Sequence, residues 1–252
     1  MRLPLLTATL LLGAAAVPST MRAQDKPKPK PVEFSGTAGF AQTNGNANAL
    51  SMNFGDKVKY SAKGWILAQD LSFFYGEADD KVNANFWNGG LRAERTLMSR
   101  IGVFAMTRFD RNVLQGVARR FEEGLGIDAK LVVAPRDKLS AQLGASAFQF
   151  TATPGSTATG KANYPALRVG LDYKHNFSDL AYVQQTGEYL PNLSDGNAYL
   201  MNTETSLVAP LSKRLGLKLG YVIRYNSAPP VKNGTQLKST DTFFSSGITF
   251  SY

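Results

Sequence analysis

The feature that most constrains the fold of this chain is an alternation of apolar and polar residues with a period of two, which begins near Val32 and continues to Tyr252. Successive side chains of a β-strand point to opposite faces, so the alternation indicates strands with one apolar and one polar face. Strands of soluble proteins average about 5–6 residues, whereas a tilted membrane-spanning strand needs about 9–11. Most segments here run to about a dozen residues, which favours strands that cross a membrane.

Twelve such segments are expected, at residues 33–43, 47–60, 64–77, 82–96, 100–112, 118–133, 138–151, 164–175, 179–190, 197–209, 214–226 and 240–252. Their connections alternate between short turns, such as residues 134–137, and mostly longer loops, such as residues 152–163 and 227–239. This asymmetry is typical of outer-membrane barrels, in which the short turns face the periplasm. We therefore predict an all-β fold, a transmembrane antiparallel up-and-down β-barrel of about twelve strands.

Alternation alone does not say which face is inside, because the apolar face would be the core of a soluble sandwich and the lipid-facing surface of a barrel. One face of the strands is nearly free of charge, and the other carries ten basic and nine acidic residues. If the apolar face meets lipid, the charged face lines the lumen, where ion pairs between neighbouring strands are expected. The candidate lumen charge network on the fourth to sixth strands comprises Arg92, Glu94, Arg108, Asp110, Arg120, Glu122, Asp128 and Lys130.

Aromatic residues support the membrane alternative. Several lie near strand ends, as Trp65, Tyr75 and Tyr173 do, which suits the interfacial girdles of a barrel. The chain also ends on Tyr252, with Phe250 and Ile248 before it on the same face. This terminal pattern resembles the signal that the outer-membrane assembly machinery recognises, so we assign these three residues to an assembly signal. A soluble periplasmic β-sheet binding protein is the alternative.

The N-terminal segment reads as a secretory signal peptide. Met1 and Arg2 precede an apolar stretch from Leu3 to Val17 and then small residues, the order expected of such a peptide. We assign residues 1–23 to it, with the cleavage site left open. Residues 24–32 contain alternating Lys and Pro and form a stiff, solvated periplasmic tether in this interpretation. Residues 33–252 then form the barrel.

Composition argues against several chemical functions. The chain has no Cys and one His, so it has no thiolate nucleophile and no His-rich metal site, and we expect no metal and no cofactor. His175, the only His, falls at a short turn rather than in a long loop, and we expect no catalytic residues. Basic residues exceed acidic ones, but they are dispersed rather than interleaved with aromatics, which argues against nucleic-acid binding. Lipopolysaccharide and outer-membrane lipid are the expected partners.

Short motifs along the chain resemble a known family. They are Arg108–Asn112, Gly116–Phe121 with Gly124–Gly126, Gly39–Phe40 with Asn44–Asn46, and Asp241–Thr242 with Tyr252. Together they resemble the bacterial domain-of-unknown-function family 481, across nearly all of the chain after the signal peptide. Members of that family include proteins described as salt-induced outer-membrane proteins. The resemblance implies an outer-membrane barrel of a Gram-negative envelope and brings no established activity or site residues.

The functional expectation is an outer-membrane β-barrel that is not an enzyme. It would be either a narrow, porin-like passive route for small solutes or ions with a charge-lined lumen, or a closed barrel with a structural or envelope-stress role. A barrel enzyme is the third class, and it would need a catalytic base that the sequence hardly offers. The solute, the inducing condition and the oligomeric state are left open by the sequence.

Overall fold

The structure, a computed structural model, describes residues 31–43 and 49–251. Its barrel strands are β1 (Val32–Thr43), β2 (Ala49–Ala62), β3 (Trp65–Ala78), β4 (Lys81–Thr96), β5 (Ile101–Asn112), β6 (Val117–Val133), β7 (Asp137–Ala152), β9 (Asn163–Asn176), β10 (Tyr182–Pro191), β11 (Tyr199–Pro210), β12 (Leu215–Asn226) and β15 (Thr240–Ser251). Between them lie a 3-10 turn, η1 (Val113–Gln115), and three short strands, β8 (Ser156–Thr157), β13 (Val231–Lys232) and β14 (Thr235–Gln236). No helix among the described residues is long and apolar enough to cross a membrane.

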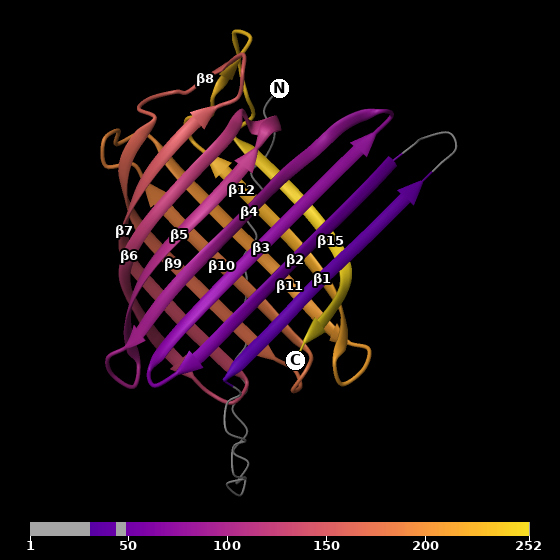
Figure 1. Ribbon diagram of the computed structural model, residues 1–252, viewed down its shortest axis with the longest axis vertical. Coiled ribbons are helices and arrows are strands. Elements are labelled where there is room, and N and C mark those ends of the chain that lie inside the picture. The colour runs from indigo at the N-terminus through magenta and orange to yellow at the C-terminus, as the bar shows by residue number, and fades with distance from the viewer. Residues whose placement is uncertain (1–30, 44–48, 252) are drawn as a thin grey trace, which may run out of the picture.

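The twelve long strands form one closed antiparallel barrel in which each strand pairs with its neighbour in the chain and β1 pairs with β15. The start of β1 and the end of β15 lie at the same end of the barrel, where the turns are short (Figure 1). The predicted fold is therefore confirmed, and the strand boundaries agree to within a few residues. The largest differences are at β10, which begins at Tyr182 rather than at 179, and at β2, which covers 49–62 rather than 47–60.

The apolar face of the strands lies on the outside. Leu67, Leu125, Ile127 and Leu171 are among its exposed residues, and Leu125 is 66% exposed. Monomeric soluble proteins rarely expose a continuous apolar surface of this extent, so the band around the barrel is suited to lipid. Glu123 is a charged exception on this face, between Phe121 and Leu125.

Two β-bulges interrupt the alternation in β6. Its pairing register with β7 shifts between Val117 and Arg119 and again between Lys130 and Val132. A bulge adds one residue to a strand and changes the face of the residues that follow it. Val132 is consequently exposed, although the sequence pattern placed Leu131 and Val133, and not Val132, on the apolar face.

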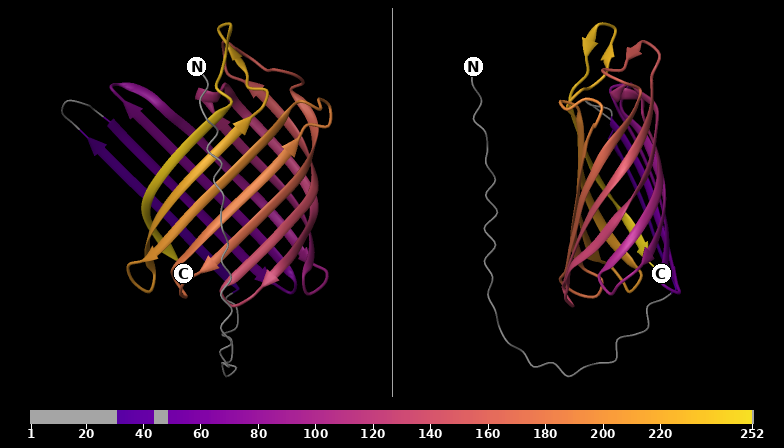
Figure 2. Two further views of the ribbon diagram at one scale, coloured as in Figure 1. Left: turned by 180° about the vertical axis from the view of Figure 1, so that it is seen from behind. Right: turned by 90° about the vertical axis from the view of Figure 1, so that its left-hand side faces the viewer.

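The barrel is flattened rather than circular. It is broad in the view of Figure 1 and narrow when turned by 90° in Figure 2. Side chains from the β3–β6 wall therefore reach those of the β9–β15 wall across the interior. At the loop-side end, Phe148, Ala166, Leu190 and Leu200 form a buried apolar cluster.

Two long loops form a small sheet above the loop-side end of the barrel. Within residues 153–162 and 227–239, β8, β13 and β14 pair in the order β14–β13–β8. The turn at Gly116 packs below it, because a Cβ placed on Gly116 would contact Leu237, Pro230 and Ser156. The sequence pattern placed no strands in these loops. Strands of two residues are too short to show an alternation.

The seam that closes the barrel is short. Among the residues that the structure describes, β1 and β15 share four partner pairs, from Ser35↔Ser251 to Ala38↔Ile248. On their other sides, β1 pairs with β2 as far as Thr43, and β15 pairs with β12 from Thr240. Towards the loop side, β1 and β15 diverge, and the loop-side ends of β1 and β2 extend away from the rest of the barrel (Figures 1 and 2).

Candidate functional site: the bridged lumen

The charged face of the strands lines the interior, where arginines and carboxylates form three groups of salt bridges. Together they contain the five arginines Arg92, Arg108, Arg120, Arg168 and Arg224 and the five acids Glu94, Asp110, Glu122, Asp128 and Glu188. We call these ten residues the bridging set. Five positive charges and five negative charges leave it with a formal charge of zero.

The loop-side part of the bridging set is centred on Asp110. Arg120 of the neighbouring strand β6 donates to Asp110 Oδ2 at 2.7 Å, and Arg224 of β12 donates to Asp110 Oδ1 at 2.8 Å. Because β5 and β12 belong to opposite walls, the second bond crosses the lumen. Arg224 also lies over the ring of Phe86, 4.7 Å from its centroid.

The central part runs from β5 through β10 and β9 to β6. Arg108 Nη1 lies 3.2 Å from Glu188 Oε1, and Arg168 Nη1 lies 2.6 Å from Glu188 Oε2. Arg168 also donates to Glu122 Oε1 at 2.6 Å, where Ser146 adds a hydroxyl donor. The guanidinium of Arg168 thus connects two carboxylates, and the chain of bonds spans the lumen from one wall to the other.

The part nearest the short turns is smaller. Arg92 Nη2 lies 3.3 Å from Glu94 Oε2 and 3.9 Å from Asp128 Oδ2, and Arg92 Nη1 donates to Gln142 at 3.1 Å. The guanidinium also covers the ring of Phe104, 3.8 Å from its centroid. Arg92 therefore bridges from β4 to both β6 and β7.

The sequence-predicted lumen residues fall into three groups. Arg92, Glu94 and Asp128 lie together, as do Arg120 and Asp110. Arg108 pairs with Glu188 of β10 on the opposite wall, and Glu122 pairs with Arg168 of β9 past the intervening strand β7, rather than with residues of the adjacent strands as expected. Lys130 lies on the charged face outside the salt bridges. The functional role of the eight residues stays a prediction.

Sequence reasoning placed Arg168, Glu188 and Arg224 on the charged face but did not include them in the candidate network. Their sequence separation from the partners is large, for example 114 residues between Asp110 and Arg224. A strand pattern shows which face a side chain occupies, but it carries no information on contacts across the interior. These three partners could be found only after the flattened cross-section was known.

The lumen also holds aromatic residues, which the sequence interpretation missed. Phe86 stacks with Phe74 at a centroid distance of 5.7 Å, and Phe243 of β15 contacts Phe86 at 4.4 Å and Phe74 at 5.8 Å. We call these three rings the aromatic cluster. The signal was present, since Phe86 shares its parity with Arg92 and Phe243 shares its parity with Asp241.

The proposed assembly signal lies at the end of β15. Ile248 and Phe250 are exposed on the outer face, where Ile248 pairs with Ala38 and Phe250 with Gly36 of β1. Tyr252 lies outside the described residues. The signal peptide and the tether up to residue 30 lie outside them as well, and β1 begins at Val32, one residue earlier than expected.

The described residues offer little to catalysis or metal binding. His175 Nδ1 lies 2.8 Å from Asp137 Oδ1 at the short-turn end, beside Tyr173, which donates to the same carboxylate. No described serine or threonine joins this pair in a nucleophile–base–orienter arrangement. Within residues 31–43 and 49–251, no group of three or more His, Cys, Asp or Glu side chains could hold a metal ion.

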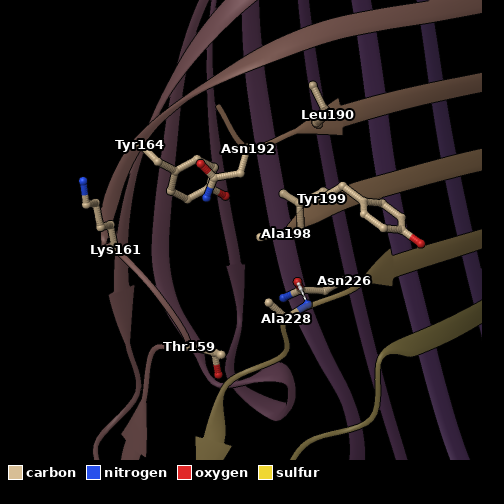
Figure 3. A pocket seen from close by; sticks show the side chains of 10 residues that line it. Thr159, Lys161, Tyr164, Leu190, Asn192, Ala198, Tyr199, Asn226 and Ala228 are labelled. Carbon is tan, nitrogen blue, oxygen red and sulfur yellow. Dashed lines mark hydrogen bonds between the residues drawn. The ribbon is translucent and has the colours of Figure 1, made fainter. Parts of the chain in front are cut away.

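A small pocket lies at the loop-side mouth, next to the buried apolar cluster (Figure 3). Its volume is about 40 Å³, and its lining includes Tyr164, Asn192, Tyr199 and Asn226. Figure 3 shows Tyr164 and Asn192 side by side at one end of the pocket. A volume of this size accommodates an ordered water molecule and is far below the roughly 300–1,000 Å³ of a typical ligand pocket. The pocket is therefore too small to be the main site.

Comparison with solved structures relates the fold to outer-membrane barrels. The NanC porin in its rhombohedral crystal form aligns with a TM-score of 0.50 and 9% identity, over 87% of this chain and 98% of that chain. The anion-selective porin from Comamonas acidovorans aligns with a TM-score of 0.41 and 11% identity, over 88% of this chain and 99% of the porin. The translocator domain of the autotransporter NalP from Neisseria meningitidis gives a TM-score of 0.43 and 10% identity, over 87% and 86% of the two chains.

The comparisons by sequence match a family model but no individual curated protein. No curated protein matches the chain. A family model described as "Protein of unknown function, DUF481" matches residues 36–252, which covers the whole barrel apart from the first residues of β1. This match agrees with the resemblance noted in the short motifs.

Proposed function

The chain belongs to the DUF481 family, whose description assigns no activity, and we propose that it is an outer-membrane barrel that acts as a narrow passage for small ions and solutes. The observation that carries this proposal is the bridging set, and above all the contacts Arg108–Glu188 and Arg224–Asp110 across the lumen. A barrel of this strand number is wider than the roughly eight-stranded kind that side chains just fill. Long charged side chains, rather than the wall, therefore set the width of the passage.

The bridging set accounts for both the size and the weak selectivity of the proposed passage. Its charges cancel, so neither cations nor anions are strongly favoured by this part of the lumen. Its guanidinium and carboxylate groups occupy the centre of the flattened section. Conduction then requires ions to pass beside the bridges, which gives a low conductance.

The test is single-channel recording of the refolded barrel in planar bilayers. Arg108→Ala should shift selectivity towards cations and Glu188→Ala towards anions, because each leaves the opposite charge in the passage. The double variant Arg108→Ala/Glu188→Ala should raise the conductance with little change in reversal potential, since it removes bulk without changing the net charge. Arg119→Ala is the matched control, because Arg119 is an exposed arginine on β6 that hydrogen-bonds Thr151 outside the bridging set.

A second variant follows from the sequence-predicted network. Replacing Arg108 and Arg120 together by Ala removes two positive charges and their bulk, so selectivity should move towards cations and the conductance should rise. If this double variant folds and keeps the wild-type conductance and reversal potential, the bridging set does not lie in a conducting path, and the proposal is wrong.

A closed structural barrel is the second candidate. The observation that favours it is the burial of Arg168 and Glu122, whose side chains are 3% and 5% exposed. Groups so fully enclosed stabilise the wall rather than contact a solute. This alternative predicts no channels from the wild-type protein and none from the Arg108→Ala/Glu188→Ala variant.

The proposed location makes outer-membrane lipid, lipopolysaccharide and the assembly machinery the partners, and it is supported by the exposed apolar band and by aromatic residues at its margins. Trp87, Phe109 and Phe121 contact one another in a row on the outside of β4, β5 and β6, in tilted and edge-to-face pairs with centroid distances of 4.5 and 4.9 Å. Arg119 lies near this row at the loop-side end, where it could contact the phosphates of lipopolysaccharide.

The proposal also covers the two segments that precede the barrel in the chain. Residues 1–23 would be removed on export and residues 24–32 would remain as a periplasmic tether. N-terminal sequencing of the protein recovered from membranes tests this division. A mature chain that still begins at Met1 would contradict it.

A further inference from the structure

The seam between β1 and β15 is open towards the loop side. Partner pairs stop at Ala38↔Ile248, although continuing the same register would bring Phe40 opposite Ser246. The last close approach is at Gly39, where a Cβ would lie 1.9 Å from the carbonyl oxygen of Ser246. Beyond it, within the described part of the chain, β1 pairs with β2 and β15 pairs with β12, but not with each other. The two strands diverge beyond this point (Figures 1 and 2), and we call the stretch over which their facing edges are unpaired the lateral opening.

Such an opening is costly in a membrane unless something occupies it. The strand edges carry backbone N–H and C=O groups, and lipid chains offer those groups no hydrogen bonds. The outer rim of the opening is apolar, since Phe40 on β1 is 66% exposed and Phe244 on β15 is 62% exposed. An occupant must therefore offer both apolar surface and hydrogen-bonding groups.

The aromatic cluster lies directly behind the opening. Phe243 comes from β15, the strand that borders the opening, and its ring packs on Phe86 of β4 and Phe74 of β3. None of these three rings belongs to β1 or β2. The aromatic cluster therefore lies between β15 at the seam and the bridging set, whose Arg224 lies over Phe86.

Two polar groups beside the aromatic cluster lack hydrogen-bond partners among the described residues. Asn112, which is 2% exposed, is the direct cross-strand partner of Phe86, and its Nδ2 has no acceptor. Asp241 lies two residues before Phe243 on the same face of β15, and its Oδ2 has no donor. Leaving such atoms buried and unpaired is unfavourable, so a ligand whose polar group pairs with them would be stabilised there.

We propose that the lateral opening binds a single-chain amphiphile from the outer leaflet, with its alkyl chain against Phe74, Phe86 and Phe243. Its head group is small and can both accept a hydrogen bond from Asn112 and donate one to Asp241, as a carboxylic acid or an alcohol can. An added β-strand from another polypeptide would satisfy the strand edges but would not use the rings or the two polar groups. The amphiphile accounts for the apolar rim, the aromatic wall and the unpaired groups together.

Photocrosslinking tests this site in the full-length barrel. The photoreactive residue p-benzoylphenylalanine would replace Phe243, and the protein would be placed in dioleoylphosphatidylcholine vesicles with and without oleic acid. Irradiation followed by intact mass measurement should show an adduct of one oleic acid. The matched control is the same replacement at Phe148, a lumen-facing phenylalanine on β7 away from the seam, which should give no adduct. Heat-modifiability on gels shows that both variants are folded.

A disulfide bond between β1 and β15 tests whether the amphiphile enters through the lateral opening. The chain has no cysteine, so Phe40→Cys/Ser246→Cys can form one bond only, which would draw the two edges together beyond the paired region. In the Phe243 photoreactive protein this bond should abolish the oleic acid adduct, and a reductant should restore it. The control bond Ala38→Cys/Ile248→Cys joins residues already paired and should leave the adduct unchanged.

Several results would overturn the proposal. Absence of an adduct at position 243, or equal adducts at 243 and 148, would show that the aromatic cluster is not a binding site. An adduct formed only with phosphatidylcholine, or with a polypeptide when the experiment is repeated in native membranes, would exclude the single-chain amphiphile. An adduct that persists with the seam locked by the Phe40→Cys/Ser246→Cys bond would exclude entry through the opening.

Discussion

Arg168 is the residue on which the interior depends most. Its guanidinium is enclosed, and it donates to Glu122 and Glu188 on either side. Removing one partner of a buried ion pair leaves an uncompensated charge, which costs about 3–5 kcal/mol. By contrast, the Lys59–Glu33 pair near the short-turn end is 43% and 54% exposed, and exposed pairs contribute at most about 1 kcal/mol.

The first residue-scale prediction compares these two pairs. Arg168→Met should destabilise the folded barrel by about 3–5 kcal/mol because Glu122 and Glu188 lose their shared partner. Lys59→Met should cost less than about 1 kcal/mol. Urea unfolding of the refolded protein in lipid vesicles measures both. Equal midpoints for the two variants would show that the enclosed pair adds no stability.

The second residue-scale prediction concerns the glycines of the wall. A Cβ on Gly126 would lie 2.4 Å from the carbonyl oxygen of Leu143 and 2.8 Å from the ring of Phe104, and the backbone oxygen cannot move aside. A Cβ on Gly187 would meet nothing within 4 Å. Gly126→Ala should therefore reduce the yield of folded barrel, while Gly187→Ala should not. Heat-modifiability on gels gives the folded fraction, and a normal yield of Gly126→Ala would contradict the crowding argument.

At the scale of the strands, the sequence predicts where the long strands lie and which side faces outward, but it does not predict their irregularities. Alternation with a period of two gave all twelve barrel strands and the correct lipid-facing side, because burial of alternate side chains is a local property. The bulges in β6 and the two-residue strands β8, β13 and β14 of the long loops were not predicted. A bulge depends on the partner strand as well as on its own residues. The apolar–polar pattern of one strand therefore does not show where an extra residue is inserted.

Contacts across the interior could not be predicted from the sequence either. The sequence placed Arg108 and Glu188 on one face, yet nothing in the pattern of β5 or β10 shows that the barrel is flat enough to join them at 3.2 Å. Neighbouring-strand pairs such as Arg120–Asp110 were within reach of sequence reasoning because adjacent strands bring their residues together in any barrel.

The prediction that belongs to β15 concerns its terminal residue. Deleting Tyr252 should lower the amount of assembled barrel in membranes, because the terminal aromatic with Phe250 and Ile248 forms the proposed assembly signal. Tyr189→Ser is the matched control, since it removes an exposed aromatic of β10 without touching the terminus. The measurement is the heat-modifiable protein recovered from the outer-membrane fraction. If both variants reach equal levels, Tyr252 is only another residue of the aromatic girdle.

At the scale of the whole molecule, the closed barrel makes a prediction about location and behaviour. The mature protein should fractionate with the outer membrane and migrate faster on gels without heating, because a closed antiparallel wall satisfies nearly all of its backbone hydrogen bonds internally and resists detergent. Recovery in the soluble periplasmic fraction would contradict the membrane assignment, since the exposed apolar band would then have no lipid to face.

The enclosure of the bridging set has a consequence for the response of the barrel to ionic strength. Mobile ions screen charges that face bulk water over a Debye length of about 8–10 Å near physiological salt, but they screen enclosed pairs much less. Arg168, Glu122 and Asp110 are almost fully enclosed by neighbouring side chains, so ions that pass beside them screen them only weakly, whereas the Lys59–Glu33 pair faces bulk water. The wall should therefore hold its shape across a wide range of external salinity, with only its rim sensitive to the surrounding electrolyte.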